Sequence, residues 1–122
     1  MATKTILVVE DDKDIRRNLK ALLESEGYLV EVAENGQIAI DFLAQATDLP
    51  NLIILDLMMP VMDGFEFREK QDQIARIASI PVAIMTADGH VEEKKFRTGA
   101  AAALRKPADI EDILATVKQL AG

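Results

Sequence analysis

Short apolar runs without polar alternation recur along this chain and constrain its fold more than any other feature. Three of them are Ile6–Val9, Leu52–Leu55 and Ile80–Met85. Strands that are buried on both faces show such continuous runs, whereas strands with one face in water alternate apolar and polar residues. Together with Leu29–Ala33 and Ala100–Leu104, these runs predict a parallel sheet of five strands.

Amphipathic stretches lie between these runs and predict the helices that connect parallel strands. Near the two ends of the chain, apolar residues recur at helical spacing in two stripes: Ile15, Leu19, Leu22 and Leu23, followed by Gly27, and Ile110, Ile113, Leu114, Val117 and Leu120. Two more helices are expected after turn signals: Ile38, Phe42 and Leu43 follow Asn35-Gly36, and Phe67, Ile74 and Ile77 follow Asp63-Gly64. The remaining candidate, Val91–Thr98, is short and has few apolar residues.

The chain is expected to form one domain over residues 1–122. Its 122 residues, of which 49% are hydrophobic, suit a single core, and no linker or internal repeat interrupts them. The alternation of strands and helices predicts an α/β fold with a doubly wound parallel sheet and right-handed crossovers. In such a sheet, a ligand binds beyond the carboxyl ends of the strands.

Composition excludes several classes of function. The 21 acidic and 14 basic residues give a net charge of −7, which argues against nucleic acid as the main partner. With no cysteine and only one histidine, His90, the chain lacks the parts of a thiolate zinc site or a Ser-His triad. No apolar run resembles a signal peptide or a membrane span, so we expect a cytoplasmic protein that does not bind membranes.

Polar and charged residues stand at the predicted ends of several strands. They are Glu10-Asp11-Asp12, Asp56, Thr86 and Lys106-Pro107. Carboxylates that meet at one edge of a sheet repel each other and ionise together only when a cation neutralises them. Because all the ligand atoms would be oxygens, the sequence predicts a site for Mg²⁺ or Mn²⁺.

These residues also have ordinary structural interpretations. The acidic run after the first strand suits the first turn of a helix, where the helix dipole stabilises it. Thr86 is of a type common in strands, and a lysine such as Lys106 is usually solvated at a strand end. Asp56 is more informative, because a carboxylate that closes an apolar run costs desolvation free energy unless a cation compensates it. A metal-bound carboxylate can attack a phosphoryl group, so Asp56 is the candidate nucleophile.

The chain resembles the receiver domain of two-component response regulators over essentially its whole length. The matching segments, in order, are Ile6–Asp12 followed by Ile15-Arg16, Asp56–Gly64, Met85–Ala87, Gly99-Ala100 and Lys106-Pro107. The resemblance implies the flavodoxin-like receiver fold, in which five parallel strands have the order 2-1-3-4-5. It also implies a phospho-accepting regulatory domain rather than an enzyme.

The resemblance further implies roles for individual residues. Asp56 would accept a phosphoryl group from a histidine kinase or a histidine phosphotransfer protein. Mg²⁺ would be bound by Asp56, Asp11 and the backbone carbonyl of Met58, and by Glu10 through a water. The spacing leaves Asp12 open as another ligand or as an acid at the start of a helix.

Three more residues are expected at the phosphoryl group. The Thr86 hydroxyl and the Ala87 backbone N–H would bond it after transfer, and Lys106 would pair with Asp56 before transfer and with the phosphate afterwards. In such domains the peptide bond between Lys106 and Pro107 is usually cis. The modification would switch the binding of a downstream protein or effector domain.

The chain departs from the family pattern on the face that usually provides output. Ala103 stands where the family usually has Tyr or Phe, and Ala108 stands where Phe is common. The segment around Asp88–Val91 is also shorter than usual. Phosphoryl transfer is therefore expected to be intact and signal output atypical.

Two other functions remain open from the sequence. A pseudo-receiver would keep the fold and act as an interaction platform without phosphorylation; the altered output face favours it, and the complete set of site residues opposes it. An aspartyl-nucleophile Mg²⁺ phosphatase would need a second carboxylate two positions after the nucleophile as a general acid. Met58 stands at that position.

Overall fold

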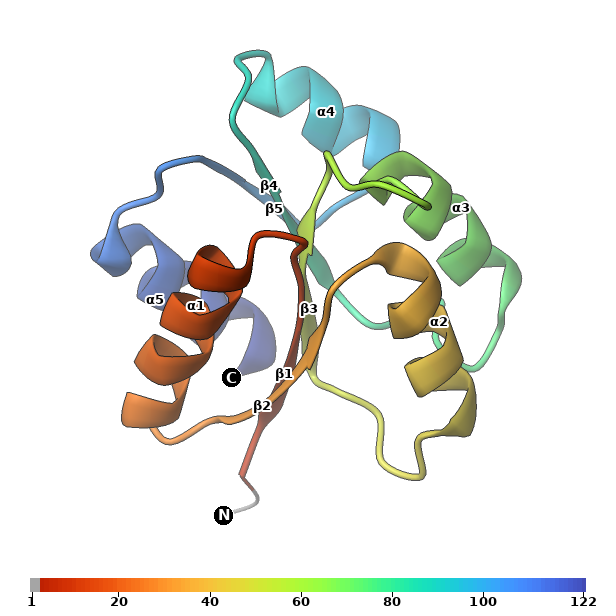
Figure 1. The fold of residues 1–122 in the computed structure, drawn as a ribbon, viewed down its shortest axis with the longest axis horizontal. Coiled ribbons are helices and arrows are strands. Elements are labelled where there is room, and N and C mark those ends of the chain that lie inside the picture. Colours follow the sequence, from red (N-terminus) through yellow and green to blue (C-terminus); the bar gives the residue numbers. More distant parts are fainter. Residues whose placement is uncertain (1–2) are drawn as a thin grey trace.

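The computed structural model describes residues 3–122, in which strands and helices alternate along the chain (Figure 1). The elements are β1 (Thr5–Val9), α1 (Lys13–Ser25), β2 (Leu29–Ala33), α2 (Gly36–Gln45), β3 (Leu52–Asp56), α3 (Gly64–Gln73), β4 (Val82–Thr86), α4 (Val91–Thr98), β5 (Ala102–Arg105) and α5 (Ile110–Ala121). Within this part of the chain, no helix combines the length and apolar character that crossing a bilayer requires.

The strands form one parallel sheet with the order β2-β1-β3-β4-β5. This confirms the predicted doubly wound α/β fold and its strand order. The second strand, β2, lies at the edge of the sheet beside β1, and the third, β3, lies on the other side of β1. The order therefore reverses between β1 and β3, and a ligand site is expected beyond the carboxyl ends of these two strands.

Helices cover both faces of the sheet and create two apolar layers. In Figure 1, α1 and α5 lie on one side of the sheet, and α2 and α3 lie on the other. Leu7 and Phe67 belong to the layer under α2 and α3, whereas Ile6 and Val117 belong to the layer under α1 and α5. Neighbours in a strand point to opposite faces, so β1 needs apolar residues at successive positions. This explains why apolar and polar residues do not alternate in β1.

Side chains of the residues directly before three helices fix where those helices begin. Asp12 Oδ1 accepts hydrogen bonds from the backbone N–H groups of Asp14 and Ile15, at 2.9 and 3.0 Å. Asn35 caps α2 in the same way, and Asp63 forms a capping box at the start of α3. Each cap of this kind contributes about 1 kcal/mol to stability.

Two strands begin later than the apolar runs predict. Ile80 is buried, but its N–H bonds to the carbonyl of Ile77 in a turn, and Pro81 has no N–H; β4 therefore starts at Val82. The chain reverses at the end of α4 through Gly99, whose φ is +69°, so β5 starts at Ala102 rather than Ala100.

The predicted third helix is also too long. Helix α3 ends at Gln73, and Ile74 and Ile77 lie in the turn that follows it. The buried Gln71 side chain donates to the carbonyls of Ile77 and Ile80 at 2.9 and 3.0 Å, which satisfies the backbone of this turn. The hydrophobic pattern could not separate a helical stripe from apolar residues in a turn that packs on the same core.

Two residues of the predicted apolar stripes do not reach the core. Ile38 in α2 is 41% exposed, and the adjacent Ala39 is fully buried instead. Ile110 in α5 is 59% exposed and lines an apolar groove between α1 and α5. Both residues lie in the first turns of their helices.

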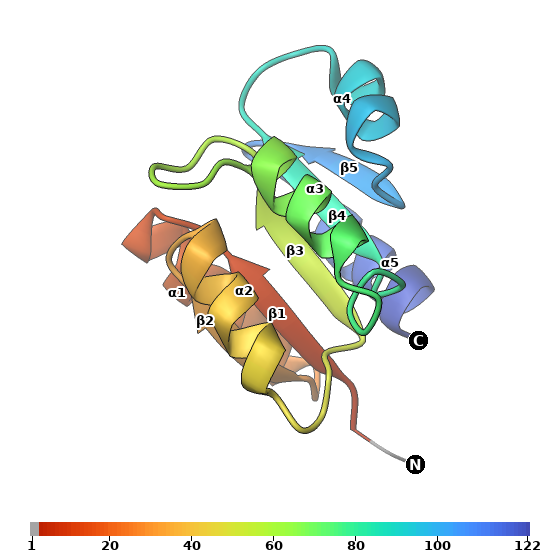
Figure 2. The same ribbon diagram turned by 90° about the vertical axis from the view of Figure 1, so that its right-hand side faces the viewer.

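Helix α4 has the predicted bounds and is the most weakly packed helix of the fold. Its only buried residue is Thr98, at its end, and Phe96 is 88% exposed. Figure 2 shows α4 beside β5, and Figure 1 shows it next to α3. This helix therefore depends on polar contacts for part of its attachment to the sheet.

Candidate functional site

The hydrogen-bond ladders of the sheet extend one residue beyond the strands and bring the candidate site residues to one edge. The N–H of Glu10 bonds to the carbonyl of Ala33 at 3.0 Å, and the N–H of Lys106 bonds to the carbonyl of Thr86 at 2.8 Å. Asp56 is the last residue of β3, paired with Met85. The parallel register therefore aligns the four predicted strand ends, as the sequence indicated.

Three carboxylates form a compact cluster at this edge. Glu10, Asp11 and Asp56 each offer an oxygen, and these oxygens lie within 4.8 Å of one another. Glu10 is fully buried and Asp56 is 3% exposed, whereas Asp11 faces solvent. Burying two carboxylates so close together is costly unless positive charge compensates them.

Lys106 supplies part of this positive charge. Its Nζ lies 2.6 Å from Glu10 Oε1 and 3.3 Å from Asp56 Oδ2, and its side chain is 18% exposed. Burial by itself lowers the pKa of Lys106, but the hydrogen bond to Glu10 and the negative charges of Asp56 and Glu10 outweigh burial and raise that pKa. The peptide bond between Lys106 and Pro107 is cis.

The environment of Glu10 favours its protonated form. The pKa of Glu10 is raised from 4.5 to about 7, because burial and then the neighbouring Asp56 raise it by more than Lys106 lowers it. Glu10 Oε1 is buried, and its partner is the Lys106 ammonium at 2.6 Å. The cluster has three carboxylates, and the Lys106 ammonium contacts two of them, so the cluster fits a divalent cation with oxygen ligands.

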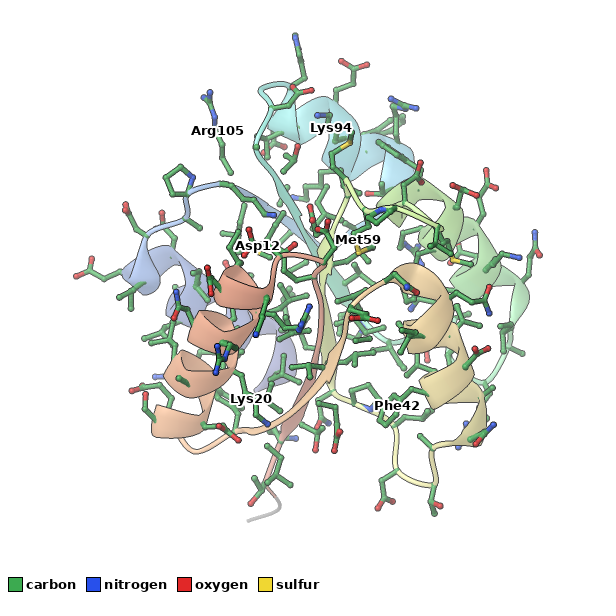
Figure 3. All side chains as sticks on the ribbon, in the orientation of Figure 1. Asp12, Lys20, Phe42, Met59, Lys94 and Arg105 are labelled. Atoms are coloured by element: carbon green, nitrogen blue, oxygen red, sulfur yellow. The ribbon has the colours of Figure 1, made fainter. Side chains whose placement is uncertain are left out.

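The structure separates the roles of Asp11 and Asp12. Asp11 joins the carboxylate cluster, whereas Asp12 caps α1 at the position labelled in Figure 3. Arg16, to which sequence analysis gave no role, donates from Nη1 to the carbonyls of Glu10 and Asp11, at 2.9 and 3.4 Å. It lies one helical turn into α1 and holds the backbone of the acidic segment in place.

The segment after Asp56 folds back tightly on β3. The N–H of Met58 bonds to Asp56 Oδ1 at 3.2 Å, and the N–H of Gly64 bonds to the carbonyl of Leu57 at 2.9 Å. A Cβ atom at position 64 would lie 2.7 Å from the Cα of Leu57, so glycine is needed there. The side chain of Met58 is 67% exposed.

Thr86 is fully buried and sits in a polar environment that the sequence did not indicate. Its Oγ1 accepts hydrogen bonds from the N–H of Asp88 at 3.3 Å and from Lys94 Nζ at 3.2 Å. Lys94 belongs to α4, and Figure 3 places it toward the same end of the sheet as Asp12. Ala87, the next predicted site residue, is exposed.

Comparisons with known proteins agree with this arrangement. A family model described as the response regulator receiver domain matches residues 6–118. The response regulator Rre1 of Synechocystis is 37% identical over 119 residues, which are 95% of this chain and 51% of Rre1. An uncharacterized 14.6 kDa protein of Leptolyngbya boryana is 36% identical over 121 residues, which are 98% of this chain and 91% of that protein.

A solved structure gives the same result. The chemotaxis protein CheY4 of Vibrio cholerae superposes with a TM-score of 0.88 at 31% identity, and the match covers 98% of this chain and 99% of CheY4. The chain thus spans almost all of CheY4 but about half the length of Rre1.

Proposed function

Because this chain belongs to the response regulator receiver domain family of two-component signalling, we propose that it accepts a phosphoryl group on Asp56 from a histidine kinase or a histidine phosphotransfer protein. The proposal depends above all on one observation: Asp56 ends β3 almost fully buried, within the acidic cluster and 3.3 Å from the Lys106 ammonium. Receiver domains are regulatory, and the modification is proposed to switch the binding of a downstream protein or effector domain.

In the transfer step, an Asp56 carboxylate oxygen attacks the phosphorus of a phosphohistidine. The bond between phosphorus and the histidine nitrogen breaks, and that nitrogen keeps the electron pair. Lys106 then faces the new phosphate as well as Glu10 and balances part of its charge. The Thr86 hydroxyl and the Ala87 backbone N–H donate to phosphoryl oxygens.

The residues that would hold a divalent ion are Asp11, Asp56 and the backbone carbonyl of Met58, with Glu10 acting through a water. The excess of carboxylates over ammonium groups in this cluster supports the assignment. When bound, Mg²⁺ supplies positive charge that stabilises the transferring phosphoryl oxygens. Mn²⁺ has a similar preference for oxygen ligands.

A second candidate function is an interaction platform that works without phosphorylation. Ala103 favours it, because this half-buried residue in β5 has no ring that could change rotamer when Thr86 moves. The phosphatase hypothesis gains no support, because Met58 offers no carboxylate and its side chain points into solvent.

The test is to incubate the protein with acetyl phosphate and Mg²⁺ and then to measure the mass of the intact chain. The wild-type chain should gain one phosphoryl unit, and Asp56→Asn should gain none. Asp63→Asn is the matched control, because asparagine caps a helix as well as aspartate and α3 should remain intact. An unmodified wild-type chain would favour the platform, and a phosphoryl group on Asp56→Asn would place the acceptor elsewhere.

A further inference from the structure

Lys94 is unusually enclosed for a lysine on an exposed helix. Its Nζ lies 2.8 Å from Asp88 Oδ2 and 3.2 Å from Thr86 Oγ1, and its side chain is only 13% exposed. The neighbouring Lys95 forms no side-chain ion pair or hydrogen bond with any residue from 3 to 122. Because lysine side chains usually keep their ammonium groups in water, this contact needs an explanation.

The contact fixes the hydrogen-bonding role of Thr86. A hydroxyl has one proton to donate and two lone pairs that accept. Both lone pairs of Thr86 Oγ1 are used, by Lys94 Nζ and by the N–H of Asp88. The hydroxyl proton is therefore left to donate, which is the role that an oxygen of an aspartyl phosphate requires.

The contact also attaches the first half of α4 to the sheet. His90 directly precedes the helix, and its side chain makes no capping hydrogen bond. The other side-chain attachments lie at its second half: Arg68 Nε donates to the carbonyl of Thr98 at 2.8 Å, and the Arg97 guanidinium lies 4.5 Å from the centre of the Phe65 ring. Lys94 thus joins the first half of the helix to Thr86 at the end of β4.

We propose that Lys94 is a positioning residue for Thr86 and that it transmits the phosphorylation of Asp56 to α4. This inference rests on the proposed function. When Thr86 donates to a phosphoryl oxygen, its own oxygen becomes a better acceptor, because hydrogen bonds in a chain polarise one another. The negative charge of the phosphate also attracts the Lys94 ammonium. Phosphorylation therefore strengthens the bond between Lys94 and Thr86 and holds α4 more firmly on the sheet.

The test is amide hydrogen exchange in Val91–Thr98, with and without acetyl phosphate and Mg²⁺. In the wild type, exchange in α4 should slow about fivefold on phosphorylation, the change expected from strengthening one hydrogen bond. Lys94→Met keeps the length of the side chain and removes its charge. It should still gain the phosphoryl group on Asp56 but lose the change in α4 exchange. Lys94→Arg should restore part of the response.

Lys95→Met is the matched control, because it removes a lysine from the next position of the same helix and should respond as the wild type does. An unchanged response in Lys94→Met would overturn the proposal. So would a loss of response in both variants, because it would show that any lost charge on α4 has this effect.

A second arm uses the unmodified protein and needs no phosphoryl transfer. Thr86→Val and Lys94→Met both remove the hydrogen bond between Lys94 and Thr86, and each also removes a contact with Asp88. Each variant should therefore speed exchange in α4, and the double variant should speed it by clearly less than the two single effects combined. Additive effects would show that Lys94 does not act through Thr86. Failure of the proposed function would instead appear as a wild-type mass that acetyl phosphate does not change.

Discussion

The ammonium of Lys106 lies 2.6 Å from Oε1 of Glu10, a carboxylate that water does not reach. A buried pair of this kind adds little to stability when it is intact, but breaking it leaves an uncompensated charge and is costly. The pair also holds two of the groups that face Asp56 in a fixed arrangement. The charges of Lys106, Glu10 and the neighbouring carboxylates lead to the first three predictions.

The stability of the metal-free protein should fall as the pH rises from about 5 to about 7. The pKa of Glu10 is about 7 in the folded chain and near 4.5 when unfolded, so the folded state binds the extra proton within this window. The stabilisation is complete below the unfolded pKa and is lost as the pH passes the folded pKa. We expect a loss on the order of 2 kcal/mol, measured by urea unfolding in EDTA.

Glu10→Gln provides the control for this pH dependence. Glutamine keeps the shape of the side chain and does not titrate, so the slope between pH 5 and pH 7 should disappear. Lys106 stays charged throughout the window because its pKa is raised, and it adds no slope. Wild-type stability that is constant or rises between pH 5 and pH 7 contradicts the assignment.

Mg²⁺ should raise the melting temperature, because a cation that binds only the folded cluster shifts the folding equilibrium. A concentration ten times the dissociation constant adds about 1.4 kcal/mol, which corresponds to a few degrees. Asp11→Asn should remove most of this shift. Asp12→Asn should keep it, because Asp12 caps α1 and asparagine caps equally well. If millimolar Mg²⁺ does not change the melting temperature of the wild type, the metal site is refuted.

Lys106→Ala should destabilise the protein by about 3 kcal/mol, because Glu10 and Asp56 lose their ammonium partner. Some phosphorylation of Asp56 should persist, but its effect on conformation should weaken. Lys20→Ala is the control: Lys20 pairs with Glu24 on the exposed surface of α1, at the other end of the sheet (Figure 3), and such a pair contributes below about 1 kcal/mol. If the two variants lost equal stability in urea, the ammonium of Lys106 would not be compensating buried carboxylates at the site.

Two glycine substitutions should have opposite effects. In Gly64→Ala, the new Cβ would lie 2.7 Å from the Cα of Leu57, so the backbone next to Asp56 must move, at a cost of about 2 kcal/mol or more. In Gly89→Ala, the new Cβ meets nothing within 4 Å, and the lower entropy of the unfolded chain should add about 0.5 kcal/mol. Urea unfolding of both variants measures the difference, and equal stabilities would show that the tight turn after β3 tolerates a side chain.

The fold was predictable because its determinants are local. Continuous apolar runs identify strands that are covered on both faces, and the caps at Asp12, Asn35 and Asp63 mark where helices begin. The predicted bounds of helices and strands were wrong where apolar residues pack into the core from a turn rather than from a helix or strand. Ile77 and Ile80 are as buried as strand residues, yet they lie in a turn held by its own backbone hydrogen bonds and by the Gln71 side chain.

The site was predictable to the extent that strand order places its residues. Glu10 and Asp56 meet because their strands are neighbours and end at the same level. Lys94 could not be found in this way, since a lysine between charged neighbours on a short helix has no distinguishing pattern. Its contact with Thr86 depends on how the chain turns at His90, which adopts a left-handed conformation with a φ of 57°.

The last prediction concerns where the protein responds to phosphorylation. Ala103 is half-buried against the layer under α2 and α3, and an alanine has no alternative rotamer through which β5 could register a movement of Thr86. A bistable element is needed for a two-state response, and α4 has few apolar anchors, so it can open at low cost. Hydrogen exchange should therefore change chiefly in residues 87–98 when Asp56 is phosphorylated, and much less in residues 100–104 and in α5. Equal changes across β5 and α5 would show that the face formed by these elements switches without the aromatic ring.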